Sequence, residues 1–269
     1  MHGDPQNQLA FLESDDAYLN VVVQGNESDD VSLTSLLRVP LNWFGDGSDA
    51  APPDSYRVLA RDFEWPSRRF VGEFVLVGGG SRSGIDGLVV TRWRSSAIVT
   101  LPLQHGVDRI EAMGNDAIVI GPHGTDLGMT TIKLAGAPVA TTTLVVENAR
   151  ESESRTHGFL YRAESANEGL FGLPLVTSTS STESASVLFV RNHHLALHSA
   201  GVLDVSETTE EDNCLVSCLD WYGNARAIFS GARVFALIGY ELIEGRVESD
   251  GQVNETARLN FNPGARTSQ

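Results

Sequence analysis

The stretch from Ala225 to Phe261 reads ARAIFSGARVFALIGYELIEGRVESDGQVNETARLNF and decides the fold class. Its short apolar runs are separated by turn signals. The strongest is Ser249-Asp250-Gly251, because Asp and Gly tolerate the positive φ of a tight hairpin turn. Beyond this turn apolar and polar residues alternate as far as Phe261, so one face of the last strand is expected on a core. The stretch predicts an antiparallel meander of about four strands.

The rest of the chain repeats this pattern. Five short, strongly apolar strands begin at residues 19, 74, 117, 187 and 234, with spacings of 55, 43, 70 and 47 residues. A β-meander that recurs every 40 to 50 residues or so is typical of propeller blades. We therefore predict an all-β fold, a β-propeller of four-stranded antiparallel meander blades, with about five to six blades in a ring that is either closed or incomplete. A β-sandwich, which also contains many short strands, is the alternative.

We expect one propeller domain over residues 1–269, with residues 1–16 partly disordered. In a closed ring an N-terminal segment completes the last blade, and Leu9 to Leu12 is the candidate for that role. If this segment does not pair with the terminal meander, the ring is open. Three segments are expected to be surface loops: residues 45–54, 177–186 and 207–213.

A strand that runs into Gly78, Gly79 and Gly80 raises the question of a phosphate-binding loop. Such a loop needs a following helix whose N-terminal amides meet the phosphates. The next apolar residues, Leu88 to Trp93, read as a strand instead. A glycine-rich hairpin loop is therefore predicted, and no cofactor is expected.

Charge limits the class of partner. The chain carries 35 acidic and 19 basic residues, for a net charge of −16, and this field repels a nucleic-acid backbone. Of the basic residues only Lys133 is a lysine, and we interpret the excess of arginine as a lineage signal. No apolar run approaches the roughly 20 residues of a membrane-spanning helix. No export signal is visible at the start of the chain.

Cys214 and Cys218 are the two cysteines of the chain. An extended strand would hold them too far apart for a disulfide, whereas a coiled segment would bring them together. The pair is a candidate structural disulfide, and two reduced thiols are the alternative. Protein sulfur from this pair alone would not complete a zinc site.

Histidines, tryptophans and carboxylates are the residue types that bear on binding or catalysis. His194 and His198 share a face of an expected strand, but same-face histidines there more often face solvent, so no metal site is predicted. We expect Trp43, Trp65, Trp93 and Trp221 to anchor blade against blade. In a propeller glycosidase, carboxylates would line the central channel. By residue type alone the candidates are Asp62, Glu64, Glu73, Asp108, Glu111 and Asp116.

Five segments resemble a group of bacterial exported proteins that carry a C-terminal β-propeller domain. The resemblance spans roughly residues 65 to 261 and lies in the strand pattern more than in a catalytic signature. It implies a propeller, a location outside the cytoplasm (extracellular, periplasmic or cell-surface), and no established activity. The missing export signal and the short length would follow if this chain is the C-terminal portion of a longer protein. The segments are Arg68 to Gly78, His105 to Gly121, Ser154 to Tyr161, Gly169 to Leu175 and Asp220 to Leu242.

The function expected from the sequence is a non-enzymatic β-propeller scaffold that binds a protein, cell-surface or other macromolecular partner. The alternative is a propeller hydrolase or lyase with a carboxylate site in its central channel. No catalytic residue is assigned. His157 is a tentative site candidate, because it lies within a segment of the family resemblance, and a buried histidine bonded to a neighbouring blade is the other interpretation.

Overall fold

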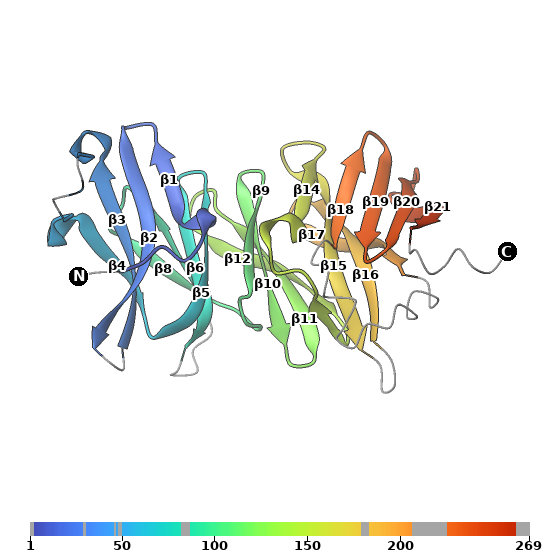
Figure 1. Cartoon of the computed structure of the whole chain (residues 1–269), viewed down its shortest axis with the longest axis horizontal. Coiled ribbons are helices and arrows are strands. Elements are labelled where there is room, and N and C mark those ends of the chain that lie inside the picture. The colour runs from blue at the N-terminus through green and yellow to red at the C-terminus, as the bar shows by residue number, and fades with distance from the viewer. Residues whose placement is uncertain are drawn as a thin grey trace. The chain divides into compact units, whose positions relative to one another are not determined.

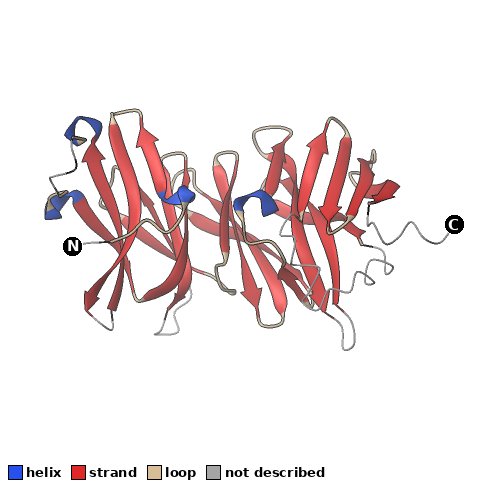
Figure 2. Cartoon of the chain, viewed as in Figure 1, coloured by secondary structure: helices blue, strands red, loops and turns tan. Residues whose placement is uncertain are grey.

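The computed structural model describes residues 3–28, 31–45, 47, 50–81, 87–178, 183–205 and 225–261. Strands dominate these residues (Figure 2). No described helix is long and apolar enough to cross a membrane. The helical segments are single 3-10 turns: η1 (Gln8–Ala10), η2 (Leu41–Trp43), η3 (Pro53–Ser55) and η4 (Thr156–Gly158).

The described strands form five antiparallel sheets, each built from consecutive pieces of chain (Figure 1). The first sheet contains β1 (Phe11–Ser14), β2 (Tyr18–Ser28), β3 (Val31–Pro40) and β4 (Tyr56–Arg61). The second contains β5 (Phe63–Val71), β6 (Phe74–Ser81), β7 (Gly87–Arg92) and β8 (Ile98–Pro102). The third contains β9 (Arg109–Met113), β10 (Asp116–His123), β11 (Asp126–Lys133) and β12 (Val139–Val146).

The fourth sheet has two short strands, β13 and β14, that both pair with β15. Its strands are β13 (Ala149–Glu151), β14 (Leu160–Ala163), β15 (Glu168–Ser178), β16 (Glu183–His193) and β17 (Ala196–Asp204). The fifth sheet contains β18 (Arg226–Ser230), β19 (Arg233–Ile238), β20 (Glu241–Val247) and β21 (Val253–Asn260).

The predicted fold class is confirmed. Five consecutive meander sheets, four with four strands and one with five, match the blade construction of a β-propeller, and five lies within the predicted range of blades. Five separate sheets also exclude the two-sheet sandwich that was the alternative. The irregular interval of 70 residues arises because residue 187 lies in β16, whereas the other four apolar runs lie in the second strand of their sheets.

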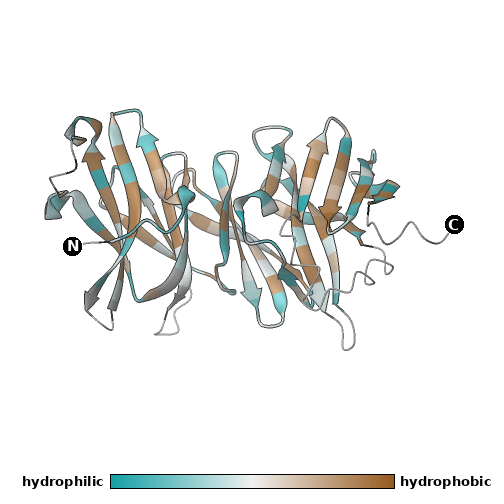
Figure 3. Ribbon diagram, viewed as in Figure 1, coloured by the Kyte–Doolittle hydropathy of each residue, from teal (hydrophilic) through white to brown (hydrophobic). Residues whose placement is uncertain are grey.

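The chain divides into two compact units, one of Met1–Ile120 with Ile132–Ala140 and the other of Gly121–Thr131 with Thr141–Gln269. Each unit buries apolar side chains between successive sheets, and apolar and polar positions alternate along many strands (Figure 3). In the first unit one core joins the first and second sheets, and another joins the second and third. In the second unit a core joins the fourth and fifth sheets.

The N-terminal segment belongs to the first sheet. η1 and β1 lie within the region expected to be partly disordered, and Phe11 of β1 pairs with Val21 of β2. The last sheet draws all four of its strands from β18 to β21. Of the candidate segment Leu9 to Leu12, Phe11 and Leu12 therefore pair within the first sheet, and the segment does not complete the terminal meander.

The glycines at residues 78–80 lie in β6 and not in a hairpin loop. Gly78 pairs with Ser67 of β5 and with Leu88 of β7. A Cβ on Gly78 would lie 2.7 Å from Cγ1 of Val107, so the glycine lets the second sheet approach the segment before β9. The loop prediction is therefore wrong at these three glycines, and at Gly78 close packing explains why the residue is glycine.

One of the three predicted loops, residues 177–186, needs correction at both of its ends. β15 continues to Ser178 and β16 begins at Glu183, so strands occupy both ends of the expected loop 177–186. The connection between β3 and β4 contains η2 and η3. Residues 207–213, together with Cys214 and Cys218, lie outside the described residues.

The terminal meander has the predicted order of strands but not the predicted burial. Only Val253 of β21 is buried, whereas Leu259 is 60% exposed. The register explains this, because Glu244 pairs with Ala257 and Gly245 with Glu255, which leaves Thr256 as an extra residue. Such a bulge moves the following side chains to the opposite face of the sheet. The predicted apolar face beyond Val253 is therefore wrong.

Candidate functional site

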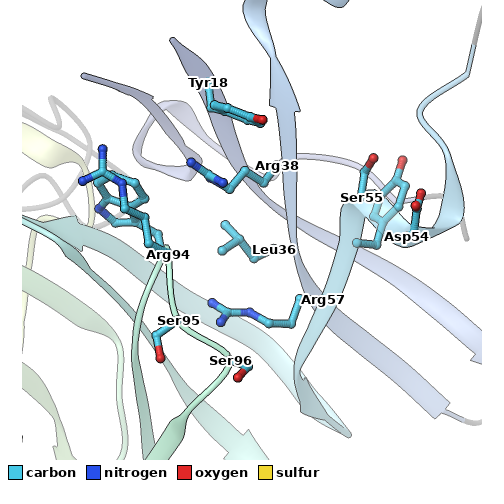
Figure 4. Close-up of a pocket in the computed structure, with 11 residues that line it drawn as sticks. Tyr18, Leu36, Arg38, Asp54, Ser55, Arg57, Arg94, Ser95 and Ser96 are labelled. Atoms are coloured by element: carbon cyan, nitrogen blue, oxygen red, sulfur yellow. The ribbon is translucent and has the colours of Figure 1, made fainter. Parts of the chain in front are cut away.

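The site that stands out chemically is a pocket of about 320 Å³ in the first unit, between its first and second sheets (Figure 4). Strands β2, β3 and β4, the η3 turn and the turn after β7 contribute its walls. We call it the arginine–aromatic pocket. It is lined by Tyr18, Leu36, Arg38, Asp54, Ser55, Tyr56, Arg57, Trp93, Arg94, Ser95 and Ser96.

Strand register explains how the sheet brings two of these arginines together. Leu36 of β3 pairs directly with Arg57 of β4. Arg38 lies two residues further along β3 and therefore shares the face of Leu36. Figure 4 shows Leu36 between the side chains of Arg38 and Arg57.

Trp93 fixes the other wall of the pocket. Its ring is buried in the core between the first and second sheets, and its Nε1 donates a hydrogen bond to the Gly72 carbonyl at 3.3 Å. This anchor holds the turn that presents Arg94, Ser95 and Ser96 to the pocket. The prediction that Trp93 packs one blade against the next is confirmed.

Aromatic rings and acidic residues hold two of the arginines in place. The Cζ atom of Arg38 lies 3.9 Å from the ring centroid of Tyr18, and that of Arg94 lies 4.2 Å from Trp93. Asp16 accepts hydrogen bonds from both guanidinium groups, at 3.2 Å from Arg94 Nε. The hydrogen bond from the Ser14 hydroxyl, together with both arginines, lowers the pKa of Asp16 to about 2. Arg38 and Arg94 are thus already neutralised.

Arg57 is different. Its Nη2 donates to the carbonyl of Arg92 at 3.2 Å, but it forms no ion pair with any carboxylate that the structure describes. Burial lowers the pKa of this half-buried guanidinium, because desolvation disfavours its charged form. An anion that entered the pocket would compensate this charge and accept hydrogen bonds from the guanidinium. Arg57 is therefore the residue of this pocket best suited to bind an anionic group.

A second, apolar pocket of about 690 Å³ lies beside β2 and β3. Leu19, Leu37 and Val39 line it together with Trp43 and Phe44. Trp43 is 55% exposed, so its predicted role as a buried anchor is wrong. The side chain of Trp65 and all of Trp221 lie outside the described residues.

The carboxylates considered for a channel site are engaged in separate contacts. Glu73 pairs with Arg92, and Asp116 accepts a hydrogen bond from the Leu134 amide at 2.8 Å. Glu111 is buried beside two arginines, 2.9 Å from Arg109 Nη1 and 3.2 Å from Arg69 Nη2. Burial raises the pKa of Glu111 although both arginines oppose the shift.

Among the described side chains, Asp62 and Asp108 have no contact that joins them to Glu73, Glu111 or Asp116. Burial raises the pKa of Asp108, against the charge of His105. Asp62 lies between β4 and β5 with a φ of 62°. The side chain of Glu64 lies outside the described residues. Neither pocket described above is lined by any of the six candidates.

His157 lies in η4, within the segment that joins β13 to β14. Its Nε2 atom is 3.3 Å from Oε2 of Glu153, which is buried and receives three hydrogen bonds from Arg155, two from the guanidinium and one from the backbone amide. Burial acts to raise the pKa of Glu153, but the contacts with Arg155 and His157 outweigh it, so the pKa is lowered. This contact of His157 lies within its own segment. His157 remains a tentative site candidate.

The arginine–aromatic pocket was missed because its residues are scattered from position 18 to position 96. The excess of arginine over lysine is the one signal of the pocket in the sequence, and composition alone does not locate a site. The alternation of Leu36 and Arg38 shows only that an arginine shares the face of a core residue. Neither signal identifies the turn that forms the opposite wall.

The chain was compared with protein families, curated proteins and solved structures. No family model and no curated protein matches the sequence. Among solved structures, a functionally unknown protein from Desulfotomaculum acetoxidans is 8% identical with a TM-score of 0.41, over 93% of this chain and 78% of that one. The β-propeller domain of the Trilobed protease from Pyrococcus furiosus is 7% identical with a TM-score of 0.41, over 92% and 84%.

The AfRom2 CNH domain is 9% identical with a TM-score of 0.38, over 94% of this chain and 84% of that domain. Similarities at this level say nothing about activity. The β-propeller assignment of this chain therefore rests on its own five consecutive meander sheets.

Proposed function

We propose that this β-propeller is a binding scaffold that recognises a protein partner by an acidic side chain inserted into the arginine–aromatic pocket. The observation that carries the proposal is Arg57, a half-buried guanidinium without an ion-pair partner among the described carboxylates. A carboxylate is the protein group that would satisfy it, because a guanidinium offers several donors in the geometry that a carboxylate accepts.

The rest of the pocket suits a protein ligand. Arginine, tyrosine and tryptophan are the residues most enriched at the energetic centres of protein interfaces. Tyr18, Tyr56 and Trp93 offer apolar surface beside the charge, and Ser55 and Ser95 add hydroxyl groups. Such a mixture fits an acidic residue flanked by apolar or aromatic neighbours.

The net charge of the chain restricts the ligand further. A chain with a net charge of −16 repels an extended acidic surface. The attraction between the Arg57 guanidinium and a carboxylate acts only over a short range. The proposal therefore favours a partner that presents one or a few carboxylates on an otherwise neutral segment. Binding should weaken as ionic strength rises, because salt screens this attraction.

Nuclear magnetic resonance of the arginine side-chain Nε–Hε groups tests where an acidic ligand binds. The probe is acetylated, amidated tetraglutamate, and the matched control is the tetraglutamine peptide. We expect the Arg57 signal, assigned from its loss in Arg57→Gln, to shift with the glutamate peptide alone. Equal shifts with both peptides, or no shift at Arg57, would contradict the proposal.

A location outside the cytoplasm belongs to the same proposal, and its support is the resemblance of residues 65 to 261 to exported propeller proteins. Cell fractionation of the source organism with an antiserum against the chain tests it. Recovery of the chain only with cytoplasmic proteins would refute this location.

A further inference from the structure

Three side chains of the types that can bind a metal ion meet at one end of the fourth sheet. Glu168 begins β15 and His193 ends β16, and the two are direct partners in the strand register. His194 is the first residue of the two-residue connection to β17. Oε1 of Glu168 lies 2.7 Å from Nδ1 of His193 and 3.9 Å from Nε2 of His194. The ligand atoms of all three residues lie within 4.8 Å of one another.

The turn that carries the histidines is unusual. His194 and Leu195 have φ values of 51° and 70°, so both adopt the left-handed conformation of a type I′ turn, which normally favours Asn and Gly. Bulky residues adopt this conformation only where their surroundings hold it. Here the Leu195 amide donates to Asn192 Oδ1 at 2.9 Å, and Thr131 Oγ1 donates to the Leu195 carbonyl at 2.7 Å.

Further contacts hold the same frame. The His194 amide donates to the Asn167 carbonyl at 2.9 Å, and Asn192 Nδ2 donates to the Tyr161 hydroxyl at 3.2 Å. The backbone positions of both histidines are therefore fixed before any ligand arrives. The two rings lie at 87° to each other with centroids 4.7 Å apart, so they approach Glu168 from different directions.

This arrangement corrects the sequence reasoning about histidines. His194 and His198 were expected on one face of a strand, but β17 begins at Ala196 and His194 lies in the turn before it. His198 is not a member of the three-residue cluster. The turn, and not strand parity, determines which histidines meet.

We propose that Glu168, His193 and His194 form a binding site for a transition-metal ion of the Zn²⁺ class. Two imidazoles and one carboxylate are a ligand set that zinc uses, whereas calcium and magnesium prefer oxygen ligands alone. Ligands about 2.0 to 2.1 Å from a tetrahedral zinc ion lie roughly 3.3 Å apart. The distances of 2.7 and 3.9 Å bracket this value, so small side-chain rotations would admit the ion.

Three protein ligands leave one position of a tetrahedral ion open. The side chains of Glu168, His193 and His194 are 39%, 59% and 63% exposed, so the open position faces solvent. Water, or a ligand from a partner protein, would occupy it. The site is separate from the arginine–aromatic pocket, and its test does not depend on the function proposed for that pocket.

Calorimetric titration of the full chain with ZnCl₂ tests the site. Cys214 and Cys218 are first changed to serine, so that thiols do not contribute to binding. We expect one equivalent of zinc, and a Kd that rises at least about tenfold in each of Glu168→Gln, His193→Gln and His194→Asn. Asn suits the left-handed position of His194, so that variant removes a ligand without disturbing the turn.

His198→Gln is the matched control, because it removes an exposed histidine of the same hairpin that lies outside the cluster. It should leave the Kd unchanged. Visible absorption of the Co²⁺-loaded chain supplies a second readout, and its spectrum should change in His194→Asn but not in His198→Gln. The proposal is overturned if zinc does not bind saturably, or if the three ligand variants bind it as the parent chain does.

Discussion

Substitution of Gly172 by alanine should destabilise the packing between the fourth and fifth sheets. A Cβ at Gly172 in β15 would lie 2.2 Å from Cβ of Ala227 in β18, and 3.3 Å from Cε1 of Phe189. Carbon atoms in favourable contact are about 3.5 to 4.0 Å apart, so the two strands would have to separate by more than about 1 Å. Overpacking of this kind costs about 1 to 3 kcal/mol, and we expect the upper half of that range.

Guanidinium-induced unfolding, followed by circular dichroism, measures this loss as a lower transition midpoint with an unchanged slope. Gly87→Ala is the control, because the nearest atoms to its new Cβ lie at ordinary distances of 3.4 and 3.5 Å. It should be neutral or stabilising by up to about 1 kcal/mol.

A second substitution makes the test specific. Ala227→Gly removes the methyl group that the new side chain would strike, so the double variant should recover part of the stability lost in Gly172→Ala. The coupling energy between the two positions should be at least about 1 kcal/mol. If Gly172→Ala unfolds at the same denaturant concentration as the parent chain, the close approach of β15 and β18 is refuted.

Three further predictions concern charge and metal. Zinc at about 100 times its Kd should raise the free energy of unfolding by about 2.7 kcal/mol, measured by chemical denaturation, and an equal rise in Glu168→Gln would contradict the proposed site. Ser14→Ala should raise the pKa of Asp16 from about 2, because the Ser14 hydroxyl is the largest cause of its depression. This contribution is present above the ordinary pKa of aspartate and is lost as the pH falls through about 2. A carboxyl titration followed by nuclear magnetic resonance checks the shift, and an unchanged midpoint would be evidence against it. Arg258→Met should lower stability by about 1 to 3 kcal/mol at neutral pH, because it removes one ion-pair partner of the fully buried Glu241, which also accepts a hydrogen bond from Asn260 Nδ2 at 3.3 Å. The addition of Glu241→Gln should recover part of that loss in the same unfolding assay, and no recovery would show that the pair is not the cause.

The strand content of this fold could be predicted because it depends on local signals. Apolar alternation and turn residues give β18 to β21 in their correct order, and the repetition of this pattern gives the blades. The signals fail where a single residue changes the parity of a strand. Thr256 is such a residue, since the bulge it forms places Arg258 opposite Ile243 and directs Leu259 to the other face.

The candidate sites depend on contacts between distant residues, and for this reason they could not be predicted. Arg57 lines the pocket because its strand partner is Leu36 and because the turn around Trp93 forms the opposite wall. The histidine cluster depends on a left-handed His194 that sequence propensity would not place there. Gly78 likewise has the sequence signature of a loop residue. It lies in a strand, and the residue is glycine because a side chain at this position would collide with Val107, which is distant in sequence.

The most direct test of the binding proposal compares two arginine variants. The Kd of tetraglutamate at low ionic strength is measured by calorimetry for the parent chain, Arg57→Gln and Arg233→Gln. Arg233 is paired with Glu244 and does not line the pocket, so its loss removes the same charge elsewhere. We predict that Arg57→Gln raises the Kd at least about tenfold, as expected for a charged hydrogen bond, and that Arg233→Gln changes it less than about twofold. Equal effects of the two substitutions would contradict the account, because binding would then follow net charge and not the pocket.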